Sequence, residues 1–101
     1  MLNVVIAEDD VFARAGMKKM IDWSELNMRV VADASNGEEA LAAYFMHKPQ
    51  ILLADLKMPR MDGLTLIRKI RQIDQEIQII ILTCHDDFAL AREAIALGVK
   101  D

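Results

Sequence analysis

Four polar side chains that could act together follow short apolar runs in the sequence. They are Glu8 and Asp9 after the first run, Asp55 after the third, and Thr83 after the fourth. If these runs are neighbouring parallel strands, their carboxyl ends meet at one edge of a sheet, where open α/β sheets bind ligands. Carboxylates that crowd together raise one another's pKa values unless a cation lies among them. The pattern therefore predicts a cation site.

The residue types at this site also indicate which chemistry it could carry. Carboxylate oxygens favour a hard divalent ion, and Mg²⁺ suits a site with few protein ligands. A carboxylate such as Asp55 beside Mg²⁺ can attack a phosphoryl group and form an aspartyl phosphate, while the hydroxyl of Thr83 could hydrogen-bond a phosphoryl oxygen. For Glu8 or Asp9 alone, a helix cap is the simpler interpretation, because acids after strands often cap the next helix. The combination with Asp55 and Thr83 favours the site.

The elements that would position these residues alternate between strand and helix patterns. The predicted strands are Asn3–Ala7, Arg29–Ala34, Ile51–Ala54 and Ile77–Thr83, the second of them at an edge. The predicted helices are about Val11 to Asp22, one that starts after Ser35 and reaches Lys48, one that starts at Asp62-Gly63, and Phe88 to Leu97. This order predicts an α/β fold with a doubly wound parallel sheet. We expect one domain that comprises residues 1–101.

Local signals mark several helix ends. Ser35 and Glu38 have the spacing of a capping box, Pro49 ends the second helix, and Gly98 is a natural residue to follow the fourth. The fourth helix carries two apolar faces, where a surface helix usually carries one. The second face could meet a partner, although an alanine-rich helix can look apolar without binding anything.

Composition excludes several classes of protein. The net charge is −4 and no basic cluster occurs, which argues against direct nucleic-acid binding by this domain. Hydrophobic residues make up 53% of the chain but come in short runs, and the first residues do not resemble a signal peptide. We therefore expect no membrane segment. Cys84 is the single cysteine, so an internal disulfide is excluded and a cytoplasmic location is the default expectation.

Taken together, these residues resemble the receiver domain of two-component response regulators. The resemblance rests on the acidic pair, the strand-end Asp55 with its loop, the threonine after an Ile-rich strand, and the final stretch. In this chain they are Glu8-Asp9, Asp55 with Lys57-Met58-Pro59 and Asp62-Gly63, Thr83, and Leu97 to Asp101. The stretches Ile21-Asp22-Trp23 and Gly98 to Asp101 further resemble receivers that are attached to AraC-type DNA-binding domains.

The resemblance implies a flavodoxin-like (βα)5 fold and a role for each matching residue. Asp55 would accept a phosphoryl group from a sensor histidine kinase. Asp9, Asp55 and the backbone carbonyl of Lys57 would bind Mg²⁺, which Glu8 would reach through water. Thr83 would move towards the phosphoryl group and shift the fourth helix, and so control a transcriptional output domain. Such a domain is a switch and not an enzyme, beyond catalysing its own phosphoryl transfer and dephosphorylation.

Two departures from the family pattern lead to further expectations. Glu8 stands where many members have aspartate. The family pattern continues into a fifth strand with a switch aromatic and a phosphate-contacting lysine. We therefore expect a truncated receiver with strand order 2-1-3-4, in which strand four or the fourth helix could form a homodimer interface. The alternative function is a receiver-like interaction module that phosphorylation does not regulate.

Overall fold

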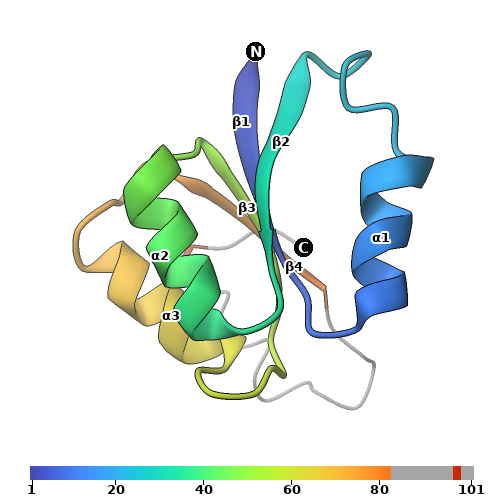
Figure 1. The fold of residues 1–101 in the computed structure, drawn as a ribbon. Coiled ribbons are helices and arrows are strands. Elements are labelled where there is room, and N and C mark those ends of the chain that lie inside the picture. Colours follow the sequence, from blue (N-terminus) through green and yellow to red (C-terminus); the bar gives the residue numbers. More distant parts are fainter. Residues whose placement is uncertain (83–96, 99–101) are drawn as a thin grey trace.

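The computed structural model describes residues 1–82 and 97–98, in which strands and helices alternate along the chain (Figure 1). The strands are β1 (Leu2–Ala7), β2 (Met28–Ala34), β3 (Ile51–Asp55) and β4 (Gln78–Leu82). The helices are α1 (Val11–Met20), α2 (Gly37–His47) and α3 (Gly63–Arg71). None of the helices within this part is both long and apolar enough to span a membrane. The predicted helix from Phe88 to Leu97 lies outside the described residues, apart from Leu97.

The four strands form one parallel sheet in the order β2-β1-β3-β4. The central strands pair in register, with Val5 opposite Leu52 and Leu52 opposite Ile79. The predicted doubly wound α/β fold and its strand order 2-1-3-4 are therefore confirmed. β2 lies at one edge, as its mixed sequence predicts, and the carboxyl ends of β1 and β3 lie side by side.

Both faces of the sheet bury apolar side chains, because successive residues of a strand point to opposite sides. In β1, Val5 and Ala7 join the cluster on the side of α2 and α3. Val4 and Ile6 join a second cluster, against which Met17 of α1 packs. Val4, Val5, Ile6 and Ala7 of β1 are fully buried, as a strand covered on both faces requires.

Helices α2 and α3 cover one face of the sheet (Figure 1). The inward face of α3 carries Leu64, Ile67 and Ile70, which are all buried. Burial of each such side chain stabilises the fold by about 1.5–3 kcal/mol. In α2, the hydroxyl of Tyr44 donates a hydrogen bond to the carboxylate of Asp74 at 2.9 Å, which ties the helix to the loop before β4.

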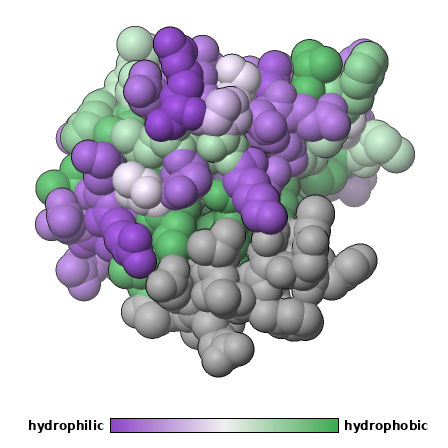
Figure 2. Space-filling view, turned by 90° about the horizontal axis from the view of Figure 1, so that it is seen from below, coloured by the Kyte–Doolittle hydropathy of each residue, from purple (hydrophilic) through white to green (hydrophobic). Residues whose placement is uncertain are grey.

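Helix α1 lies on the opposite face and buries little of its own surface (Figure 1). Of the helical positions Ala13, Met17 and Met20, only Met17 packs partly against the core, and Met20 is 87% exposed. Phe12 is 85% exposed. Exposed hydrophobic residues also lie on the side where α1 stands in Figure 1, interspersed with hydrophilic ones (Figure 2).

The caps of α1 and α2 test the predicted helix starts. Asp10 caps α1, because its carboxylate accepts hydrogen bonds from two backbone amides of the first turn. The capping box predicted at Ser35 and Glu38 is wrong by one residue. Asn36 is the cap of α2 and accepts from the amide of Glu39, whose own carboxylate accepts from the amide and hydroxyl of Ser35. The bond from the Glu39 amide to Asn36 is that of a capping box, but the return bond goes to Ser35, one residue before the cap, and not to the amide of Asn36.

Candidate functional site

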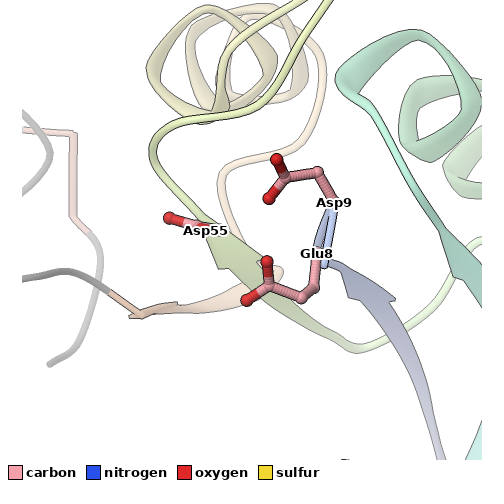
Figure 3. Close-up of side chains that lie close together, drawn as sticks. All are labelled: Glu8, Asp9 and Asp55. Carbon is pink, nitrogen blue, oxygen red and sulfur yellow. The ribbon is translucent and has the colours of Figure 1, made fainter. Parts of the chain in front are cut away.

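The carboxylates of Glu8, Asp9 and Asp55 lie together at the carboxyl edge of the sheet (Figure 3). One oxygen from each residue lies within 4.8 Å of those from the other two. Glu8 and Asp9 directly follow β1, and Asp55 is the last residue of β3. These strands are neighbours, with Ala7 opposite Ala54 at the ends of the pairing. The structure thus brings the three predicted acids together.

Glu8 is the buried member of this group. It is 7% exposed, and burial raises the pKa of its carboxyl group to about 7. The amide of Asp10 donates to Glu8 Oε2 at 3.1 Å and opposes that rise in pKa. The carboxyl groups of Asp9 and Asp55 raise the pKa of Glu8 further. The site therefore concentrates negative charge that a cation would relieve.

Asp55 is half-buried and is oriented by the chain that follows it. Its Oδ1 accepts a hydrogen bond from the amide of Lys57 at 3.2 Å. The amide of Gly63, at the start of α3, donates to the carbonyl of Leu56 at 2.9 Å. A Cβ atom at Gly63 would overlap the carbonyl oxygen of Asp55, so only glycine allows this close approach.

The loop between β3 and α3 is also held by the start of α2. The amide of Gly37 donates to the carbonyl of Met61 at 3.0 Å, and a Cβ atom at Gly37 would overlap the backbone of Met61. The next residue, Asp62, caps α3 by accepting from the amide of Thr65 at 2.8 Å. Two helix starts therefore fix the segment that leaves Asp55.

Sequence reasoning missed Arg14 of α1, which contacts the turn that carries two of the acids. Its Nη1 donates to the backbone carbonyl of Glu8 at 2.7 Å, and its Nε donates to the carboxylate of Asp33 at 3.0 Å. An arginine one turn into a helix that follows an acidic turn is the signal that could have indicated this contact. Its reach back to the turn depends on a side-chain conformation that spacing does not reveal.

Two other predicted site features stay predictions. Thr83 lies outside the described residues, so its predicted contact with a phosphoryl group is untested. The backbone carbonyl of Lys57 is a predicted metal ligand, and the structure gives the amide of this residue a bond to Asp55.

The chemistry of the donor set fits a hard divalent cation. The described cluster offers oxygen atoms from three carboxyl groups, and oxygen ligands are those that Mg²⁺ and Ca²⁺ prefer. Few protein ligands at an open sheet edge suit Mg²⁺, which keeps several of its waters. Burial, with a smaller contribution from Asp9 and Asp55, raises the pKa of Glu8, and a bound cation would oppose that rise.

The sequence profile of the response regulator receiver domain matches residues 4–101 of this chain. The chain belongs to this family. Receiver domains are signalling switches rather than classical enzymes, and the acidic cluster described above is of the kind at which they bind Mg²⁺. The resemblance to receiver domains that the sequence indicated is therefore confirmed at the level of the family.

Two solved structures and one curated relative illustrate the similarity. The receiver domain of AraT, a response regulator from Geobacillus stearothermophilus, is 45% identical with a TM-score of 0.93, covering 99% of this chain and 78% of that one. The CheX–CheY–BeF3–Mg complex from Borrelia burgdorferi contains a chain that is 27% identical with a TM-score of 0.86. The match covers 98% of this chain and 74% of that one. The uncharacterized transcriptional regulatory protein YesN from Bacillus subtilis is 36% identical over 100 residues, or 99% of this chain and 27% of YesN. The present chain thus spans about a quarter of that relative.

Proposed function

We propose that this receiver domain accepts a phosphoryl group on Asp55 with the help of Mg²⁺. The observation that carries the proposal is the convergence of Asp55 with Glu8 and Asp9, one of them buried with a raised pKa. A helix-capping role explains Asp10, but it does not explain why the carboxylates of Glu8, Asp9 and Asp55 cluster. The similar CheY complex, which contains BeF3 and Mg, supports the same assignment.

The chain's own residues account for the transfer as follows. A carboxylate oxygen of Asp55 attacks the phosphorus atom of a phosphohistidine, and an O–P bond forms as the P–N bond breaks. The electron pair of the broken bond stays on the histidine nitrogen. The amide of Lys57 holds the Asp55 carboxylate in a fixed orientation, so little freedom is lost on reaching the transition state.

Glu8, Asp9, Asp55 and the backbone carbonyl of Lys57 would hold the Mg²⁺ ion, with Glu8 reaching it through water. When bound, the ion neutralises the charge that the phosphoryl oxygens bring to an already acidic site. Thr83 would then hydrogen-bond the phosphoryl group and convey its presence to the segment that follows.

The partners belong to the same proposal. A sensor histidine kinase donates the phosphoryl group, and an output domain, of AraC type by the resemblance at Ile21-Asp22-Trp23, binds DNA. The similarity to YesN, an uncharacterized transcriptional regulatory protein, supports the transcriptional output. Such a signalling pair operates in the cytoplasm. A homodimer through β4 or the segment 88–97 stays a prediction.

Intact-mass spectrometry after incubation with acetyl phosphate tests this function. Wild-type protein with Mg²⁺ should gain the mass of one phosphoryl group, stable in acid and removed by hydroxylamine, and a chelator should abolish the gain. Asp55→Asn should lose it entirely, because the amide cannot act as the nucleophile.

Asp62→Asn is the matched control, since Asp62 is a carboxylate of the same loop whose bond to Thr65 serves a helix cap. This variant should still be phosphorylated, because asparagine also caps helices. A mass gain that persists in Asp55→Asn would refute the assignment, and its absence from the wild type would favour an interaction module without phosphorylation.

A further inference from the structure

We propose that Arg14 is a positioning residue for the Mg²⁺ site. Its guanidinium group holds the backbone of the turn that carries Glu8 and Asp9, so that their carboxylates stand ready for the ion. This role rests on the proposed function, because it presumes that these acids bind Mg²⁺.

The contacts of Arg14 join three elements. The side chain comes from the first turns of α1, where the amide of the same residue donates to the carbonyl of Asp10 at 2.9 Å. Nη1 donates to the carbonyl of Glu8 at 2.7 Å, and Nε donates to Asp33 of β2 at 3.0 Å. The side chain of Arg14 is 17% exposed and that of Asp33 31%. A planar guanidinium can serve both acceptors in one fixed geometry.

These contacts hold the peptide groups of Glu8 on both sides. Its amide donates to the carbonyl of Ala34 at 3.0 Å, and its carbonyl accepts from Arg14. Its carboxylate also accepts from the amide of Asp10 at 3.1 Å. The peptide that Arg14 binds is the one that joins Glu8 to Asp9, so the restraint acts on the two neighbouring acids at once.

The direction in which Mg²⁺ affinity changes when Arg14 is replaced distinguishes a positioning role from a simple charge effect. A guanidinium and Mg²⁺ repel each other, so loss of the positive charge alone would strengthen Mg²⁺ binding. Loss of the restraint would weaken it, because the acids would have to be ordered when the ion binds. Lys18 provides a matched comparison, since it lies on the same helix and also pairs with Asp33, at 3.5 Å.

Isothermal titration calorimetry with MgCl2 should measure the affinity of wild type, Arg14→Met, Arg14→Lys and Lys18→Met. We expect Arg14→Met to bind Mg²⁺ roughly tenfold more weakly, at the lower end of what partners of metal ligands contribute. Lys18→Met should bind as tightly as wild type or more so. Arg14→Lys should be intermediate, because an ammonium keeps the charge but lacks the fork that serves two acceptors.

A kinetic readout separates the site from general damage. With acetyl phosphate as donor, Arg14→Met should raise the Mg²⁺ concentration for half-maximal phosphorylation and leave the rate at saturating Mg²⁺ nearly unchanged. The reason is that Asp55 belongs to β3, whereas the contacts of Arg14 are to the turn after β1 and to β2. Circular dichroism in EDTA should show that each variant folds.

Several results would overturn the proposal. Arg14→Met that binds Mg²⁺ as tightly as wild type, or an equal loss in Lys18→Met, contradicts positioning and leaves the proposed function intact. If Arg14→Met fails to fold, Arg14→Lys decides the matter, and an unchanged affinity overturns the proposal. A wild-type protein that binds no Mg²⁺ refutes the proposed function, and the positioning role with it.

Discussion

Glu8 places an ionisable carboxyl group where only 7% of the residue is exposed, beside two further carboxylates. Burial, opposed by the amide of Asp10 and reinforced by Asp9 and Asp55, raises its pKa from 4.5 to about 7. In the absence of metal, Glu8 therefore gains a proton on folding at pH values between 4.5 and about 7. Protons and Mg²⁺ compete for the same oxygen atoms.

This shift predicts how stability of the metal-free protein depends on pH. Between pH 4.5 and 7 the folded form binds more protons at Glu8 than the unfolded form does. The contribution of Glu8 to stability is fully present below pH 4.5 and is lost as pH rises through 7. Glu8→Gln should flatten the decline, since glutamine does not titrate. Urea denaturation in EDTA at several pH values measures this.

Glu39→Gln serves as the control for this series. The pKa of Glu39 is lowered by hydrogen bonds from the amide and hydroxyl of Ser35, so its contribution is lost only as pH falls below 4.5. The decline between pH 4.5 and 7 should persist in Glu39→Gln. A decline of equal slope in Glu8→Gln would show that the buried carboxyl is not its source.

At the scale of elements, α2 and α3 together fix the loop that follows β3 and Asp55. Gly37 at the start of α2 meets the backbone of Met61, and Gly63 at the start of α3 meets that of Asp55. Neither contact leaves room for a Cβ atom. These glycines are required for close approach of backbones, and not for a positive φ angle.

Gly37→Ala should destabilise the protein by about 1–3 kcal/mol, the usual cost of forcing an extra group into a packed site. Gly16→Ala offers a matched control within α1, because a Cβ atom there would meet nothing within 4 Å. Alanine is the better helix former, so Gly16→Ala should stabilise by about 0.5–1 kcal/mol. Thermal denaturation of both variants tests the pair. Equal effects at the two positions would contradict the steric role of Gly37.

At the scale of the whole molecule, the alternation of strand and helix patterns was enough to predict the parallel sheet. Along β1 and β3, the residues on both faces of the strand are apolar. Only a sheet covered on both faces needs strands of this kind. Asp55 at the end of such a run then predicted where the acids would meet. The order 2-1-3-4 came from the resemblance to receiver domains and agrees with the structure.

Features that depend on side-chain reach were not predictable from spacing. The cap of α2 falls on Asn36 and not on Ser35, since adjacent polar residues both fit the pattern and only backbone geometry chooses between them. The bond from Arg14 to the carbonyl of Glu8 depends on the position of α1 over β2. The exposure of Met20 depends on how closely that helix packs against the sheet, which periodicity does not indicate.

The most direct test of the central claim is fluorine-19 NMR of the protein in the presence of beryllium, fluoride and Mg²⁺. Trifluoroberyllate mimics a phosphoryl group on a carboxylate, and the similar CheY complex contains BeF3 and Mg. If Asp55 accepts phosphoryl groups at a Mg²⁺ site, bound fluorine resonances should appear in wild type and in Asp62→Asn. They should vanish in Asp55→Asn and on chelation of Mg²⁺. Bound resonances that persist in Asp55→Asn, or that never appear in wild type, would contradict it.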